Sequence, residues 1–85
     1  MIGVRWDQDA EKQGKFIIRD FDSYSPGLVA GLSVGDEVLE INGMNPGDKR
    51  AKRARFEAPP GTKFTYRIKR GDDRLNVEME TVAPP

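Results

Sequence analysis

The chain has 85 residues, enough for one small domain, because a chain of this length buries only about 60 to 65% of its unfolded surface. It contains no cysteine and no histidine, which excludes disulfides, thiolate or imidazole metal sites, and nucleophiles activated by histidine. Fourteen basic residues balance fourteen acidic ones, and no apolar run approaches the roughly 20 residues that cross a bilayer. We therefore expect no cofactor, no binding of nucleic acid and no direct membrane insertion.

The chain opens with an alternation of apolar and polar side chains over residues 2–7. This alternation predicts a half-buried strand, with its apolar positions at Ile2, Val4 and Trp6. The strand frays into a polar stretch over residues 8–14.

A second strand is predicted over residues 15–21. Phe16 and Ile18 share one face of this strand, because side chains two residues apart point the same way. Phe21 lands on the opposite face unless the strand bends near Asp20.

Residues 25–31 carry the signals of a very short helix. Ser25 can cap the helix, and Pro26 stands at its first position, where the missing N–H costs nothing. Gly31 tolerates a positive φ angle, so the helix should end there.

Residues 34–43 add a turn, a strand and a hairpin signal. Val34-Gly35-Asp36 has the composition of a tight turn, and the large aliphatic residues over 38–41 predict a strand. Asn42-Gly43 is the strongest short signal for a two-residue hairpin turn.

A basic helix is predicted from Lys49 to about Glu57, after a turn over residues 45–48 and before Pro59-Pro60-Gly61. Its basic residues are Lys49, Arg50, Lys52, Arg53 and Arg55. From the residues alone, this run fits a solvated face, a nucleic-acid patch, a membrane-surface helix or a groove wall for an acidic peptide. The acidic residues elsewhere in the chain weigh against nucleic acid.

The chain ends in a predicted hairpin. Apolar residues alternate over 64–68 and again over 75–79, with Gly71-Asp72-Asp73 between the two segments. We interpret Asp72 and Asp73 as turn residues, since a calcium site would need several more oxygen ligands nearby.

The order of these signals over residues 25–43 resembles the middle of a PDZ domain. The matching motifs are Ser25-Pro26-Gly27, Ala30-Gly31-Leu32, Gly35-Asp36 and Asn42-Gly43. Gly27 stands where the family usually has alanine, which predicts a helix weaker by about 1 kcal/mol. The resemblance implies an α+β, mainly β fold, a partly open antiparallel β barrel of five to six strands capped by two helices. The domain would span residues 1–82, with 83–85 as a linker or tail.

A PDZ-like fold implies recognition of a peptide, at its C-terminus or as an extended hydrophobic segment, by its addition as a strand to a sheet edge. Met1-Ile2-Gly3-Val4 supplies the last three positions of the family's carboxylate-binding loop, with Met1 in place of its first glycine. The resemblance assigns five residues to the peptide groove: Ile2, Gly3, Val4, Arg5 and Trp6. Periodicity alone also allows the apolar ones to be core residues of an edge strand.

The basic helix would form the second wall of the groove. Its wall residues are Arg50 and Ala54 when counted back from Gly61, or Lys49 and Arg53 when Phe56 is taken as a core residue. In either register a cation heads the helix, so acidic ligand side chains should be favoured there. The histidine that many PDZ domains place at this position is absent.

The ending from Pro60-Gly61 to Arg70-Gly71 looks more like the PDZ domains appended to bacterial proteases and peptidases than like scaffold PDZ domains. The resemblance implies a non-catalytic, monomeric module of a larger protein, regulatory or substrate-binding, whose partner is a peptide or a protein C-terminus. The alternative is a structural docking domain that packs against its parent's catalytic domain. The cell envelope or periplasm is the compartment expected of such a parent.

Overall fold

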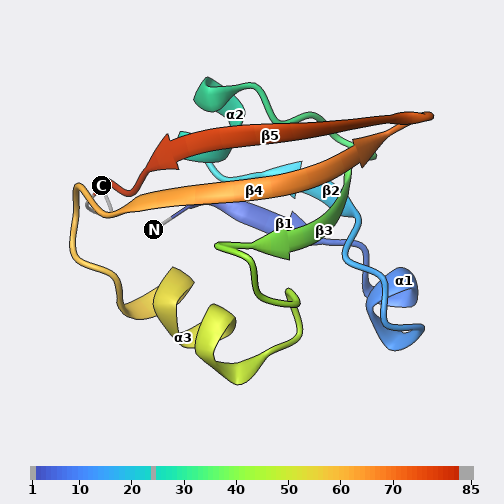
Figure 1. The fold of residues 1–85 in the computed structure, drawn as a ribbon, viewed down its shortest axis with the longest axis horizontal. Coiled ribbons are helices and arrows are strands. Elements are labelled where there is room, and N and C mark those ends of the chain that lie inside the picture. The colour runs from blue at the N-terminus through green and yellow to red at the C-terminus, as the bar shows by residue number, and fades with distance from the viewer. Residues whose placement is uncertain (1, 24, 83–85) are drawn as a thin grey trace.

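The computed structural model describes residues 2–23 and 25–82, apart from the side chain of Phe56. Short strands and helices alternate along the chain (Figure 1). In order they are β1 (Val4–Trp6), α1 (Gln8–Lys12), β2 (Ile18–Phe21), α2 (Pro26–Ala30), β3 (Glu37–Ile41), α3 (Lys49–Glu57), β4 (Lys63–Arg70) and β5 (Asp73–Glu80). The tail predicted at 83–85 lies outside the described residues.

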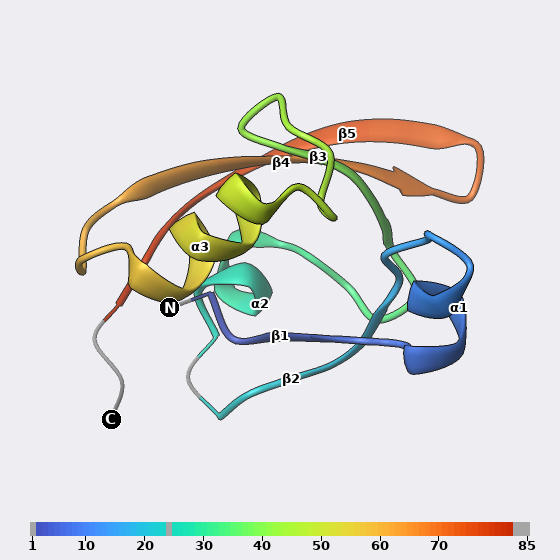
Figure 2. The same cartoon turned by 90° about the horizontal axis from the view of Figure 1, so that it is seen from below.

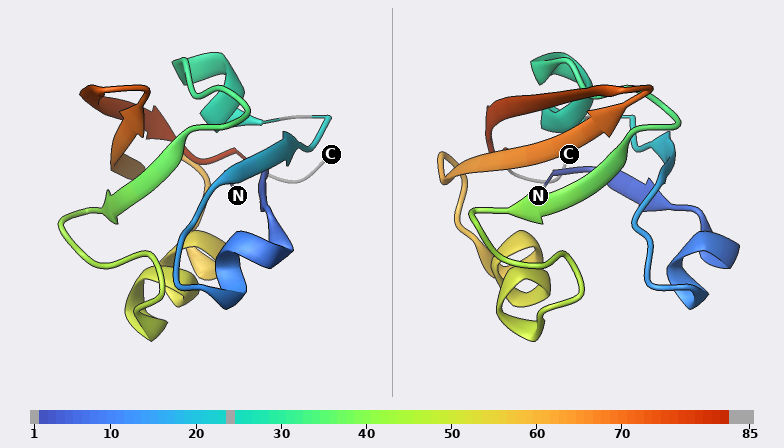
Figure 3. Two further views of the ribbon diagram at one scale, coloured as in Figure 1. Left: turned by 90° about the vertical axis from the view of Figure 1, so that its right-hand side faces the viewer. Right: turned by 45° about the vertical axis from the view of Figure 1, so that its right-hand side comes forward.

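The strands form two antiparallel sheets, β1-β2 and β3-β4-β5. A single bridge between Ile17 and Glu37 links them, and the Val38 N–H donates to the Phe16 carbonyl at 2.8 Å. Figure 3 shows β2 lying next to β3, so the two sheets curve around a shared interior without closing. The expected open, mainly β architecture is therefore confirmed.

The two predicted helices are present, and the structure adds a third. Ser25 caps α2 by accepting the Leu28 N–H at 3.2 Å, and Asp48 caps α3 by accepting the Arg50 N–H at 2.8 Å. The added helix α1 falls in the stretch that the sequence indicated only as polar. Its residues are all exposed or half-buried, so no apolar stripe could signal it, and its cap from Asp7 is a local hydrogen bond of 3.0 Å to Ala10.

The second strand does bend near Asp20, through a register shift. Arg5 pairs with Asp20, but Trp6 pairs with Ile18, so Arg19 is left over on β2. Because of this irregularity, Phe21 packs partly buried against the same core as Ile18.

Both predicted hairpin turns, after β3 and between β4 and β5, form with two residues each. Asn42 and Gly43 have φ angles of 51° and 77°, and Ile41 and Met44 exchange hydrogen bonds across them at 2.8 and 2.9 Å. The second turn consists of Gly71 and Asp72, and the prediction that Asp73 is a turn residue is wrong, because Asp73 begins β5 and pairs with Arg70. Strand β3 pairs with β4 along its length, whereas the segment that follows the Asn42-Gly43 turn is joined to β3 by the bridge between Ile41 and Met44.

The interior is mainly apolar, and the buried carboxylate of Asp36 lies at its edge in an ion pair with the partly exposed Arg70. Its core residues are Ile2, Phe16, Ile18, Leu32, Val38, Ile41, Ala51, Phe64, Tyr66, Ile68 and Met79. At its edge the Arg70 guanidinium donates to both carboxylate oxygens of Asp36, each at 2.8 Å, and to the Gly31 carbonyl at 2.9 Å. Burial acts to raise the pKa of Asp36, but the hydrogen bonds from Arg70 and from the Ser33 N–H outweigh it and leave that pKa lowered. Arg70 at the end of β4 is thus tied to the residue before β3 and to the residue that ends α2.

Candidate functional site

Strand β1 has one paired edge and one free edge. On the paired edge, the Gly3 carbonyl accepts the Asp22 N–H and the Asp7 N–H donates to the Ile17 carbonyl, both at 2.8 Å. Backbone groups alternate in direction along an antiparallel strand, so those of Val4 and Trp6 face the other edge. In the part of the chain that the structure describes, no strand pairs with that edge. Figure 2 shows β1 lying between β2 and α3.

The segment leading into β1 is held by the cap of α2. The Ser25 hydroxyl is buried and donates to the Ile2 carbonyl at 2.9 Å, while the Gly27 N–H reaches the same oxygen at 3.3 Å. Gly3 follows with a φ angle of 75°, a conformation that lets neighbouring backbone N–H groups converge on an anion. Met1, the first residue of the predicted loop, lies outside the described residues.

Gly27 gives Ile2 and Val4 room to pack against α2. A Cβ atom at position 27 would lie 2.9 Å from Leu32 Cδ1, 3.1 Å from Val4 Cγ2 and 3.5 Å from Ile2 Cγ2. The glycine that departs from the PDZ pattern therefore has a packing reason, in addition to its cost in helix stability. Ile2 is buried and Val4 is half-buried, so only Val4 of the two offers surface at the strand.

Trp6 links β1 to α3 through an arginine that the sequence did not single out. The Arg55 guanidinium carbon lies 5.1 Å from the centroid of the Trp6 ring, and that ring meets Phe16 edge-on at 5.6 Å. Arg55 is only 7% exposed. Arg55 lies four residues after Ala51, which is fully buried, so the two share one helix face, but the sequence of the helix has no apolar stripe that marks this face.

Tyr66 of β4 lies beside the same arginine. Burial raises the pKa of Tyr66 to about 12, and the positive charge of Arg55 acts against that rise. Arg55 thus joins a strand of each sheet, with Trp6 on one and Tyr66 on the other.

Arg5, the polar member of the predicted set, is occupied by β2. Its guanidinium donates to Asp22 at 2.8 Å from Nε, with a second contact at 2.6 Å from Nη2, and Asp20 lies 3.6 Å away. Because side chains alternate along a strand, Arg5 lies on the opposite face from Val4 and Trp6.

The other predicted helix residues line a pocket on the far side of α3. Arg50, Arg53 and Ala54 surround this pocket of about 540 Å³ together with Asn42 and Phe64, and we call it the far pocket. Among the described residues, none from β1 lines it. Both predicted pairs of wall residues, Arg50 with Ala54 and Lys49 with Arg53, therefore line the far pocket. Phe56, on which the second register depends, has a side chain outside the described part.

Ion pairs within α3 hold two of these cations. Arg50 Nη2 lies 3.0 Å from Asp48 Oδ2, and the side-chain and backbone hydrogen bonds from Arg50 lower the pKa of Asp48. Arg53 reaches Glu57 at 4.0 Å, one turn along the helix.

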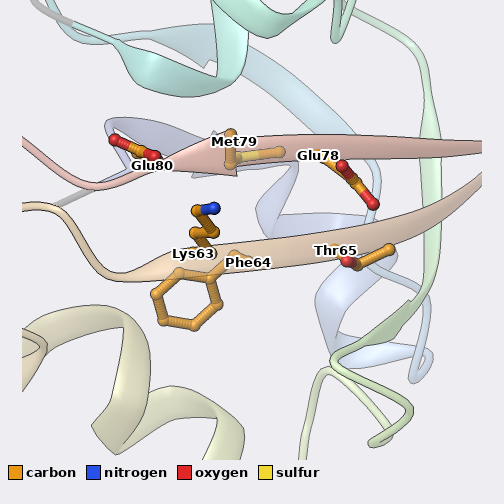
Figure 4. Close-up of a pocket in the computed structure, with 6 residues that line it drawn as sticks. All are labelled: Lys63, Phe64, Thr65, Glu78, Met79 and Glu80. Atoms are coloured by element: carbon orange, nitrogen blue, oxygen red, sulfur yellow. The ribbon is translucent and has the colours of Figure 1, made fainter.

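A second hollow, of about 560 Å³, lies over the paired strands β4 and β5 (Figure 4). Lys63 stands opposite Glu80 and Thr65 opposite Glu78 across the ladder. Its lining combines the apolar side chains of Phe64 and Met79 with polar and charged ones, and it lies over two strands that pair with each other.

Neither a metal cluster nor a membrane span is found in residues 2–23 and 25–82. No group of three or more His, Cys, Asp or Glu side chains is placed to hold an ion there. No helix in the same ranges is long and apolar enough to cross a bilayer.

Solved structures share this fold. The HtrA-type protease AlgW with a decapeptide gives a TM-score of 0.76 at 23% identity, over 100% of this chain and 30% of that chain. AlgW with a tripeptide gives 0.75 at 21% identity, over 100% of this chain and 32% of that one. The HtrA3 PDZ domain bound to the phage-derived ligand FGRWV gives 0.68 at 19% identity, over 94% of this chain and 82% of that one. No protein-family model and no curated protein sequence matches the chain.

The chain therefore has the fold of a PDZ domain, as the motifs over residues 25–43 predicted. It spans about 30% of the length of the AlgW chains that it matches. Both AlgW structures and the HtrA3 structure carry peptides, and the likeness to them at these identities concerns the fold.

Proposed function

We propose that this domain binds the C-terminal segment of a partner protein by adding it as a strand to the free edge of β1. The observation that carries the proposal is that edge itself, where the backbone groups of Val4 and Trp6 face away from β2. The positive φ angle of Gly3 supports it, since Gly3 stands at the end of β1 where a terminal carboxylate would arrive.

Each residue at the edge has a distinct part in the proposal. Backbone N–H groups near Gly3 bind the carboxylate, and Val4 contacts the last side chain of the ligand. Ile2 supports Val4 from the core, and Trp6 extends the contact surface along the strand. Arg55 lies next to Trp6 and supports its ring from α3. Arg5 and the Arg50, Arg53 and Ala54 set remain predictions for this site.

An aliphatic C-terminal residue fits this edge best. Burying one Val or Leu side chain contributes about 1.5 to 3 kcal/mol, and few other contacts add to it. We therefore expect weak binding, with dissociation constants in the micromolar range or higher.

Glycine substitutions test this proposal. A labelled peptide ending in Ala-Val with a free carboxylate is titrated against the wild-type domain, Gly3→Ala and Gly14→Ala. Gly14 is the matched control, because it also has a positive φ of 79° but lies in open space after α1. Gly3→Ala should weaken binding about tenfold or more, and Gly14→Ala should leave it unchanged. Equal affinities for all three proteins would refute the role of Gly3.

In the parent protein, we propose a regulatory or substrate-binding part for this module. The fold is shared with chains named as HtrA-type proteases, of which it spans about 30%. The domain would present peptide termini to a separate catalytic domain and carry no catalysis of its own. The cell envelope or periplasm is the compartment that this parentage suggests.

Docking against the parent's catalytic domain is a second candidate, which one surface favours. Leu28, Val29 and Val34 on and after α2 are 53%, 88% and 62% exposed, an unusual set of uncovered aliphatic side chains. If docking is the function, Leu28→Ser with Val29→Ser should loosen the domain from its parent in limited proteolysis. Peptide binding at β1 would be unaffected by that pair of changes.

A further inference from the structure

The basic residues on the far side of α3 border a hollow of their own. Arg50 and Arg53 line the far pocket, and none of its described lining residues comes from β1. In the view of Figure 2, β3 and β4 lie on one side of α3 and β1 on the other, while all three strands lie above α3 in Figure 1. We propose that the far pocket is a second binding site, for an acidic segment of a partner protein that carries aliphatic side chains.

The floor of the far pocket is apolar. Ala54, Ala58 and Pro59 line it from α3 and the segment after it, and Phe64 lines it from β4. Figure 4 shows the Phe64 ring directed toward α3. The two alanines are small enough to leave space between the helix and the strand, and 540 Å³ falls within the range of natural ligand pockets. An aliphatic side chain of a short segment can fill this space.

The rim of the far pocket is basic. Its lining includes Lys49, Arg50 and Arg53 against a single acid, Glu57. The Arg50 and Arg53 side chains are 79% and 77% exposed, so both can turn from their neighbours in α3 toward a ligand. Asn42 adds a donor, because its Oδ1 already accepts the Thr65 N–H at 2.8 Å and its NH₂ group can serve a carboxylate. This excess of positive charge complements an acidic segment.

The same geometry favours a peptide over a nucleic acid. Single-stranded nucleic acids bind by stacking bases on exposed aromatic rings beside a basic groove. Among the described residues that line the far pocket, Phe64 is the aromatic one, and it is only 2% exposed, so its ring offers no platform for a base. Small apolar walls under a basic rim match glutamate and leucine side chains better.

The probe is the capped peptide acetyl-Glu-Leu-Glu-Leu-Glu-amide, titrated into isotope-labelled domain and followed by NMR. Both ends are blocked, so the probe cannot use the carboxylate loop proposed at Gly3. The amide signals of Asn42, Ala54 and Thr62 should shift, and those of Gly3 and Val4 should stay. Shifts confined to β1, or no shifts at millimolar peptide, would overturn the proposal while leaving the proposed function intact.

Paired charge removals measure the part of the rim. Arg50→Gln with Arg53→Gln should weaken probe binding by roughly two- to fivefold for each charge removed. The matched control is Arg67→Gln with Lys69→Gln, which removes two exposed charges of β4 that line neither hollow. Equal weakening by both pairs would mean a general charge effect and would contradict a site in the far pocket.

Three further probes test the occupant. Acetyl-Glu-Glu-Glu-Glu-Glu-amide should bind more weakly, because it leaves the apolar floor unfilled. Acetyl-Lys-Leu-Lys-Leu-Lys-amide should not bind. A short single-stranded DNA that shifts the same amides at lower concentration than the glutamate-leucine peptide would overturn the assignment to a protein segment.

Discussion

The two sides of α3 carry arginines in opposite environments. Arg55 is 7% exposed and lies over Trp6, whereas the side chain of Arg53, two residues earlier, is 77% exposed above the far pocket. Two residues along a helix correspond to a rotation of about 200°, so the pair points to nearly opposite sides. The basic residues of α3 therefore have two different roles. Arg55 packs in the interior next to β1, and Arg53 is exposed to solvent, where a partner can reach it.

The largest effect that this contrast predicts is on stability. Arg55→Ala should lower the free energy of unfolding by about 2 to 3 kcal/mol, because it removes buried packing and the contact with Trp6. Arg53→Ala should change it by less than about 0.5 kcal/mol, since that side chain is exposed. Urea denaturation of both variants measures the difference.

A third variant separates packing from charge. Arg55→Met keeps most of the volume next to Trp6 and should recover much of the stability lost in Arg55→Ala. If Arg55→Ala and Arg53→Ala unfold at the same urea concentration, the two sides of α3 do not differ as described.

Gly27→Val probes the other support of β1. The new side chain would crowd Val4 and Leu32 and should destabilise the domain by about 1 to 3 kcal/mol. Gly27→Ala should change stability by less, because the gain in helix propensity of about 1 kcal/mol offsets a milder crowding. Titrations of Gly27→Ala should show weaker binding of the Ala-Val peptide. Unchanged binding of the capped acidic peptide would confirm that the disturbance stays on the β1 side.

The titration of Tyr66, which lies beside Arg55, makes the free energy of unfolding depend on pH. Its pKa is raised to about 12 in the folded domain, mainly by burial, against about 10 in the unfolded chain. As the pH rises, the unfolded chain therefore loses the Tyr66 proton before the folded domain does. The contribution of Tyr66 to the free energy of unfolding is complete below pH 10 and falls as the pH rises toward 12. The loss should be about 1 kcal/mol at pH 11. Urea denaturation at pH 9 and 11 should show it in the wild type and not in Tyr66→Phe.

The smallest predicted effect is on peptide selectivity. If Arg50 and Arg53 faced the ligand at β1, replacing both with Glu would reverse a preference for acidic peptides. Since they line the far pocket, we expect the double variant to bind free-acid peptides within about twofold of the wild type. Fluorescence polarisation with matched acidic and basic peptides measures this, and a reversed preference would restore the sequence-based assignment.

Local signals in the sequence were enough for much of this fold. The cap at Ser25, the end of the helix at Gly31 and the turn at Asn42-Gly43 each depend on a few neighbouring residues, and each formed as predicted. The helix α3 also has the predicted bounds. Such features need no knowledge of distant contacts.

The rotation of α3 about its axis could not be predicted in the same way. It is set by tertiary contacts of Ala51 and Arg55 with the interior, and a helix with basic residues on every side has no apolar stripe to indicate them. The packing role of Gly27 also could not be predicted, because Val4 contacts this position only after β1 packs on α2.

The central claim is that a C-terminal carboxylate binds at the free edge of β1, and one NMR comparison tests it most directly. Labelled domain is titrated with one Ala-Val-ended peptide as the free acid and as the C-terminal amide. The free acid should shift the amide signals of Ile2, Gly3 and Val4 and bind at least several-fold more tightly than the amide. Equal shifts and equal affinities for the two forms would contradict a carboxylate site at Gly3.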